Sequence, residues 1–166
     1  MTTNAYWSWD AAERRCFEYF QAIIGGLEGV TGFMPEDYPR WATTAEECNN
    51  WAFEISGGDR PHIRSPVERG NARTMWMMAT FKARFTERQL AKRVACLAWD
   101  ALPAGVADVA TYPMLAGIAQ IQPTAYPQLM ADVQEIANDQ DEGGETRVWT
   151  VEIPCWVVFD YMDQYT

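Results

Sequence analysis

The stretch ARTMWMMATFKARFTERQLAKR, residues 72–93, decides the fold class of this chain. Apolar side chains alternate from Met75 to Phe85, and this period of two predicts a strand with one buried face. The spacing of apolar residues then changes to three and four, which predicts an amphipathic helix. Thr86 and Gln89 are expected to form a capping box at the start of that helix. The stretch therefore predicts a strand followed directly by a helix.

The same two periodicities predict the other elements. Apolar residues recur every three or four positions between Trp9 and Leu27, which predicts an N-terminal helix. Asp10 is expected to cap this helix, with Glu13 on its exposed side as the capping-box partner. Alternation predicts strands at 51–55, 118–122 and 146–159, and residues 133–137 are expected to enter the hairpin that leads to the last strand.

Together these elements predict a single α+β domain over residues 1–166, with flexible termini at about 1–7 and 161–166. The sheet is expected to be mainly antiparallel, with the N-terminal helix and the second helix packed on one face. Residues 57–73, GGDRPHIRSPVERGNAR, are expected to form a long hairpin loop, and loops of this length are usually functional or mobile. Pro154 is expected at an edge position or a bulge of the last strand.

Charge is distributed unevenly along the chain. The formal net charge is −10, which argues against a nucleic-acid-binding surface over the whole molecule. Residues 60–93 contain nine basic and two acidic side chains, whereas residues 132–163 contain nine acidic and one basic. Opposite charges of this kind suit head-to-tail contacts between copies, which can close into a ring. Solvated faces of a monomer are the alternative interpretation of the same charges.

Residues that could perform catalysis or bind a metal are few. The four cysteines lie far apart and His62 is the single histidine, so the paired spacing of a zinc site is absent and a reduced, intracellular protein without metal is expected. Neither GxGxxG nor GxxxxGK occurs, so no nucleotide-phosphate loop is predicted. We expect no enzymatic activity and no cofactor. A small enzyme or ligand-binding domain that uses His62 and the acidic hairpin remains the hypothesis from another class.

The methionine and tryptophan side chains of residues 75–78 are apolar on both faces of the predicted strand. Methionine usually fills a core, but one of these two faces is also suited to packing against another subunit, where Trp and Met are enriched. No run of about 18–20 apolar residues is present, so no membrane helix is predicted, and no secretory signal is visible. The residues expected at a subunit or partner interface are Arg60, Arg64, Arg69, Arg73, Met75, Trp76, Met78, Asp139, Asp141, Glu142 and Glu145.

The order of elements resembles that of the tail terminator (tail-completion, neck) proteins of long-tailed bacteriophages. The likeness covers about residues 8–160: an N-terminal helix, the strand WAFEI, a long loop, the strand TMWMMATFKARF followed by the helix TERQLAKRVACLAWDAL, and a hairpin ending in TRVWTVEIPCWVVF. The resemblance implies a homohexameric ring that caps the tail tube and joins it to the head. By analogy, the arginine-containing loop from Arg60 to Arg73 would face a neighbouring subunit or ring.

The resemblance also implies partners and a place of action. A tail tube protein and a head–tail connector or stopper would contact the ring, and DNA would pass through its lumen without specific binding. An acidic protein suits that role because it repels phosphate. The protein would be assembled in the host cytoplasm and reside in the virion. Another neck or tail component, such as a connector or stopper itself, is the alternative.

Overall fold

The structure is a computed structural model that describes residues 9–39, 48–63, 72–135 and 145–162. Its helices are α1 (Trp9–Ile24) and α2 (Arg88–Asp100), and short 3-10 turns occur at η1 (Pro35–Asp37), η3 (Val106–Asp108) and η4 (Pro113–Leu115). Its strands are β1 (Thr31–Phe33), β2 (Asn50–Ile63), β3 (Ala72–Phe85), β4 (Ala104–Gly105), β5 (Ile118–Pro123), β6 (Gln128–Glu135) and β7 (Glu145–Met162).

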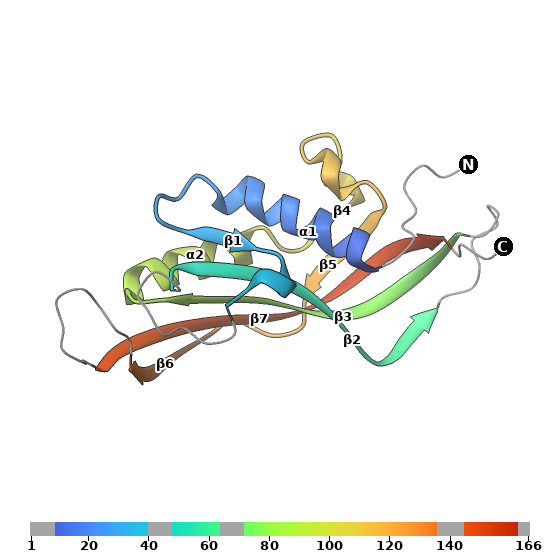
Figure 1. The fold of residues 1–166 in the computed structure, drawn as a ribbon. Helices are drawn as coiled ribbons and strands as arrows, with labels where there is room; N and C mark the ends of the chain where they lie inside the picture. Colours follow the sequence, from blue (N-terminus) through green and yellow to red (C-terminus); the bar gives the residue numbers. More distant parts are fainter. Residues whose placement is uncertain (1–8, 40–47, 64–71, 136–144, 163–166) are drawn as a thin grey trace.

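The strands form one curled sheet in the order β1-β2-β3-β7-β5-β4, and β6 also pairs with β7. Every neighbouring pair is antiparallel except β1 and β2. Both helices lie on one face of this sheet, with α1 against β2 and α2 against β3 and β7 (Figure 1). The predicted α+β fold, with two helices on one face of a mainly antiparallel sheet, is therefore confirmed.

The core lies between the helices and the sheet. On β3 the buried residues are Met77, Ala79, Phe81, Ala83 and Phe85, which is the alternation expected of a strand with one buried face. The residues of α1 that enter the core are Ala12, Cys16, Tyr19, Phe20 and Ile24, spaced by three and four.

Aromatic rings join the two layers at the centre of the core. The ring of Phe20 on α1 lies 5.1 Å from that of Phe53 and 5.2 Å from that of Phe81. Trp51 stacks on Phe81 at 5.7 Å and on Phe17 of α1 at 5.2 Å. Aromatic pairs at these distances add to the free energy gained from burying their surface. Phe20 therefore ties α1 to both β2 and β3.

Strand β7 is the common partner of three other strands. It pairs with β3 from Trp149 to Phe159 and beyond, while its other edge pairs first with β6 and then with β5. Pro154 lies where the two partners change. Its carbonyl accepts a hydrogen bond from Thr124 N at 2.8 Å, so its missing N–H faces the same gap and removes no bond to β3. Pro154 therefore lies at a locally unpaired edge position, as predicted, although β7 as a whole is an interior strand that pairs regularly with β3 here.

The predicted bounds of the hairpin loop are also wrong. Strand β2 extends from Asn50 to Ile63 and β3 begins at Ala72, so residues 57–63 and 72–73 belong to strands. The register shifts on both sides of Gly57, and four residues of β2 then lie opposite a single residue of β3. Such bulges destroy strict alternation, which explains why only the first part of β2 was predicted. The remaining connection, 64–71, lies outside the described residues.

Residues Thr31–Phe33, for which no strand was predicted, form β1 and pair in parallel with β2. Two other expectations need correction. Strand β7 continues to Met162, two residues into the terminus that was expected to be flexible, and residues 1–8 and 163–166 lie outside the described part of the chain. The predicted capping box is absent, since Glu87 occupies the N-cap of α2 without a side-chain hydrogen bond and Thr86 N donates to Asn49 Oδ1 at 3.2 Å.

Replacing Phe20 with alanine tests this description of the core. The side chain is fully buried among aromatic rings, so we expect Phe20→Ala to lower the free energy of unfolding by about 3–5 kcal/mol. Urea denaturation followed by circular dichroism measures the change. Thr111→Ala, at an exposed position, is the control and should change stability by less than about 0.5 kcal/mol. A loss below about 1 kcal/mol for Phe20→Ala would contradict the packing of α1 on the sheet.

Candidate functional site

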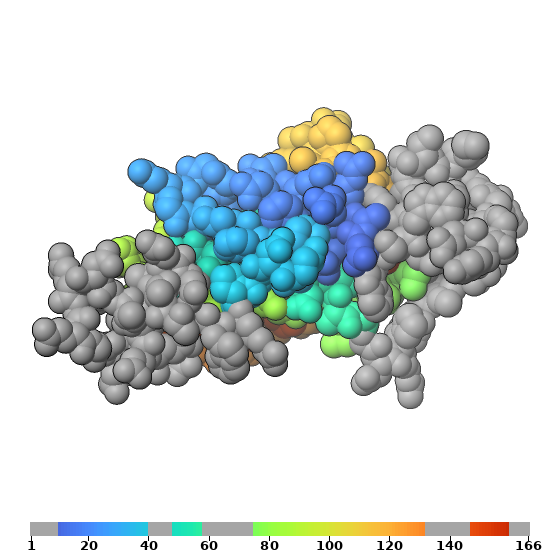
Figure 2. Space-filling view, viewed as in Figure 1, coloured from blue at the N-terminus to red at the C-terminus, as the bar shows by residue number. Residues whose placement is uncertain are grey.

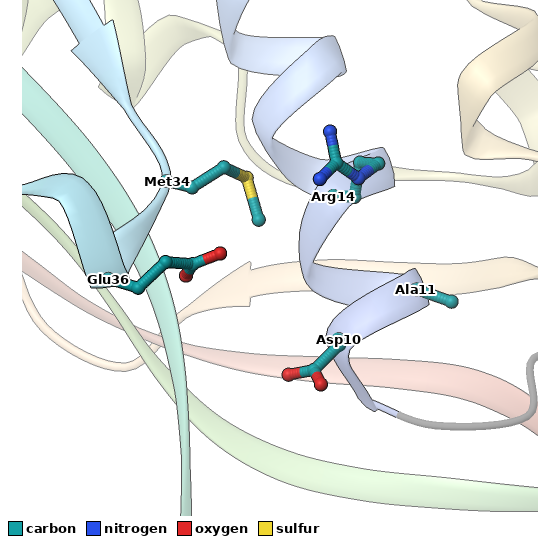
Figure 3. A pocket seen from close by; sticks show the side chains of 5 residues that line it. All are labelled: Asp10, Ala11, Arg14, Met34 and Glu36. Atoms are coloured by element: carbon teal, nitrogen blue, oxygen red, sulfur yellow. The ribbon is translucent and has the colours of Figure 1, made fainter.

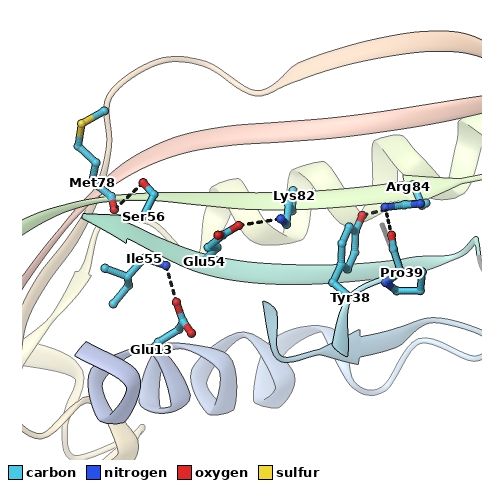
Figure 4. A network of polar contacts seen from close by, with 9 residues as sticks. All are labelled: Glu13, Tyr38, Pro39, Glu54, Ile55, Ser56, Met78, Lys82 and Arg84. Atoms are coloured by element: carbon cyan, nitrogen blue, oxygen red, sulfur yellow. Dashed lines mark hydrogen bonds and ion pairs between the residues drawn. The ribbon is translucent and has the colours of Figure 1, made fainter. Parts of the chain in front are cut away.

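The sheet face opposite the helices is divided into two halves, and the chain itself covers the first. Tyr38 lies over this half, with its ring centroid 5.0 Å from Lys82 Nζ and 4.5 Å from the guanidinium carbon of Arg84. Arg84 Nε donates to Tyr38 Oη at 3.1 Å, and the Arg84 guanidinium also donates to the carbonyl of Pro39 (Figure 4). Lys82 Nζ pairs with Glu54 Oε2 at 2.7 Å.

This cover continues across the sheet to β7. Cys48 and Val148 form a small buried cluster, separate from the main core, and Val148 lies on the same face of β7 as Thr150, the register partner of Arg84. Burial raises the pKa of Tyr38, and its hydrogen bond and charge interaction with Arg84 oppose that shift. In the charged half of this face, Tyr38 and Pro39 thus hold Arg84, and Glu54 pairs with Lys82.

The second half of the same face carries six uncharged residues, of which Met78 and Gln122 are exposed and the other four are partly buried. We call it the open patch and define it by Trp76, Met78 and Thr80 on β3, Pro154 and Trp156 on β7, and Gln122 on β5. The register places Met78 opposite Trp156, which lies opposite Gln122 in turn. Met78 is 46% exposed, a large fraction for an apolar side chain in a sheet, and Figure 4 shows it pointing away from α1.

The apolar residues that were predicted together at an interface lie on two different faces of the sheet. Trp76 and Met78 both lie in the open patch. Met75 has the opposite parity, faces the helix side and packs against the core cluster. Trp156, Pro154 and Gln122 were not predicted. Their parity was visible in the sequence, but only the strand register shows that they lie beside Met78.

The predicted charged residues fall at two ends of the sheet. Arg60 and Arg73 belong to β2 and β3 near the connection between these strands, and Glu145 begins β7 at the far end. The remaining predicted residues, Arg64, Arg69, Asp139, Asp141 and Glu142, lie outside the described residues.

Basic and acidic residues are less clearly separated in the folded structure than they are along the sequence. Asp160 lies opposite Thr74, at the end of the sheet that carries Arg73. Arg88 lies at the other end, where its guanidinium and that of Arg147 approach the ring of Trp149 at 5.4 Å and 5.9 Å. Basic and acidic residues therefore both occur at each end of the sheet, and a contact driven by these charges alone has little support.

A second polar feature lies between α1 and β2. Glu13, expected on the exposed side of α1, is only 6% exposed, and its Oε2 accepts a hydrogen bond from Ile55 N at 2.7 Å (Figure 4). Ile55 precedes the first register shift of β2, so the carboxylate binds a backbone donor at the bulge. Burial raises the pKa of Glu13 from 4.5 to about 7; the bond from Ile55 opposes this shift, and the nearby carboxylates of Glu36, Asp10 and Glu54 add to it.

A hollow of about 620 Å³ lies between the first turn of α1 and η1. Its lining residues are Asp10, Ala11, Arg14, Met34 and Glu36, which Figure 3 shows around the space. Figure 2 shows α1 and the segment that contains η1 side by side on this surface of the molecule. The lining mixes both signs of charge with the two apolar side chains of Ala11 and Met34, which does not define a ligand class.

The described residues bring together no recognisable catalytic group. His62 lies in β2 opposite Trp76 rather than in a loop. Within residues 9–39, 48–63, 72–135 and 145–162, no group of three or more His, Cys, Asp or Glu side chains could hold a metal ion. Cys16, Cys48 and Cys155 are buried and Cys96 is exposed. Burial raises the pKa of Cys16 and, to about 12, that of Cys155, so neither supplies a thiolate nucleophile.

Neither helix of the described chain has the length and hydropathy that a membrane span requires. In comparisons with known proteins, no family model and no curated protein matches the chain.

Glu13→Gln tests the buried carboxylate. The pKa of Glu13 is raised in the folded state, so ionisation of its carboxyl group disfavours folding. The free energy of unfolding of the wild type therefore falls as the pH rises from about 4.5 through about 7. The glutamine is neutral, and its side-chain oxygen can still accept from Ile55 N. We expect the variant to gain roughly 1–3 kcal/mol relative to the wild type between pH 4 and pH 8.

Urea denaturation at several pH values measures this gain. Glu28→Gln is the matched control, because it removes an exposed carboxylate with the same change of charge. If the free energies of unfolding of the two variants depend on pH in the same way, the pKa of Glu13 is not raised in the folded protein.

Proposed function

We propose that this chain is a structural subunit of the neck of a long-tailed bacteriophage, which acts as a tail terminator. Copies of the chain would form a homohexameric ring that ends the tail tube and joins it to the head. The ring would contact the tail tube protein on one side and the head–tail connector or stopper on the other. Its place of action would be the virion, after assembly in the host cytoplasm.

The observation that carries this proposal is the arm at one end of the sheet. We define the arm as residues 62–63 of β2, 72–74 of β3 and 160–162 of β7. Figure 1 shows these strand ends running beyond the first turn of α1. In the described part of the chain, neither α1 nor α2 extends over these strand ends (Figure 1). Two or three strands without a covering layer are marginally stable alone, so we propose that a neighbouring subunit packs on the arm.

The charge of the chain is consistent with a passage for DNA. A net charge of −10 gives phosphate no broad attractive surface. A lumen built from such subunits would let DNA pass without holding it. Turnover and a cofactor play no part in this function, and the proposal assigns no catalytic residue.

Native mass spectrometry of the full chain at micromolar concentration tests the proposal. We expect a species with six times the 18.9 kDa mass of the single chain, and negative-stain electron microscopy should show rings with a central opening. A chain that stays monomeric over the whole concentration range would overturn the proposal. A ring that binds connectors but not isolated tail tubes would assign the chain to a different position in the neck.

A further inference from the structure

One backbone donor of β2 is bound by a side chain instead of by a neighbouring strand. Thr31 N donates to Asn49 O, and β1 ends at Phe33, whose partner on β2 lies three positions before Ile55. Because the N–H groups of a strand alternate between its two edges, the odd-numbered residues of β2 direct theirs toward β1. Ile55 N is therefore the next donor on this edge beyond the end of β1, and Glu13 Oε2 accepts its hydrogen bond (Figure 4).

The carboxyl group at this position has no cation paired with it. Glu13 is buried, and among the residues that the structure describes it takes part in no ion pair. The charged groups that act on it are Asp10 on α1, Glu36 on η1 and Glu54 on β2, all carboxylates. The thiol of Cys16 on α1 is neutral, because burial raises its pKa. The short elements β1 and η4, which also pack against α1, contain no ionisable side chain.

We infer that Glu13 is a pH-sensitive latch between α1 and the outer edge of β2. The protonated side chain remains buried and accepts the hydrogen bond from Ile55 N. When the carboxyl proton passes to water, the ionised side chain leaves this position for solvent and exposes the donor. The inference goes beyond the proposed ring and does not depend on it.

The environment of Glu13 disfavours its ionised form at this position. A buried charge without an opposite charge is costly, and three neighbouring carboxylates add repulsion. Burial is the larger cause and the carboxylates are the smaller one; together they outweigh the bond from Ile55 N and raise the pKa of Glu13 to about 7. Both forms are therefore populated near neutral pH, and raising the pH through this range should open the latch.

The position of the latch lets it open without disrupting the sheet. Ile55 N faces the outer edge of β2, so its release removes no hydrogen bond to β3. The register shifts on both sides of Gly57 follow directly, and the strand then continues to the arm. Opening therefore frees the edge of β2 between its regular part and the arm.

Amide–water exchange measured by NMR on the full chain tests the inference. The rate for each amide is divided by its intrinsic rate at the same pH, which gives its protection. Asn49 N, which donates to Arg84 O at 2.8 Å, is the internal reference. We expect the protection of Ile55 relative to Asn49 to fall roughly tenfold between pH 6 and pH 8, since the protonated fraction of a group with a pKa of about 7 falls by that factor.

Two variants assign this change to Glu13. Glu13→Gln cannot ionise and keeps an acceptor for Ile55 N, so the relative protection of Ile55 should stay high at both pH values. Glu28→Gln removes an exposed carboxylate elsewhere and should show the same fall as the wild type.

Two results would overturn the inference. If the relative protection of Ile55 in the wild type is the same at pH 6 and pH 8, ionisation does not open the latch. If Glu13→Gln shows the same fall as the wild type, another group causes it. Neither measurement requires assembly, so either result would leave the proposed ring standing.

Discussion

The fold depends on the pairing of β3 with β7, which continues through fourteen residue pairs without a register shift. Because side chains alternate along both strands, this pairing sends one set of residues toward α1 and α2 and the other set to the opposite face. The first set includes Phe81, Phe85, Ile153 and Phe159, all fully buried. The core and the open patch are therefore two consequences of one register.

Pro154 permits β7 to serve as this common strand. Its missing N–H faces the gap between β5 and β6, where Thr124 donates to its carbonyl. The chain can thus change partners along one edge of β7 while the other edge remains paired with β3. The same residue is one of the six that define the open patch.

Parts of this structure followed from sequence because their signals are local. The β3–α2 unit was predicted correctly because its periodicity changes from two to three and four between Phe85 and Leu90. The second half of β2 was missed because bulges near Gly57 interrupt its alternation. Burial of Glu13 was also missed, since its partner Ile55 is distant in sequence and no helical pattern reveals which strand residue the carboxylate will meet.

The candidate site was predictable only in part, for the same reason. Trp76 and Met78 were recognisable as apolar residues on the exposed parity of a strand. Their grouping with Trp156 and Gln122 depends on how β3, β7 and β5 pair, and no local pattern specifies that register. The sequence suggested that basic and acidic residues are segregated. The structure gives this less support, because Arg88 lies beside β7.

Nuclear Overhauser effects between β3 and β7 test the register of this pairing most directly. Because the backbone of Pro154 faces away from β3, the pair of Met78 with Trp156 is not hydrogen-bonded, and Cα atoms in such pairs approach to about 4.5 Å. A strong contact between the Hα protons of these two residues is therefore expected. A slip of one residue would exchange the two faces of β7. Strong contacts from Met78 Hα to Cys155 Hα or Val157 Hα instead would reveal such a slip and contradict the account.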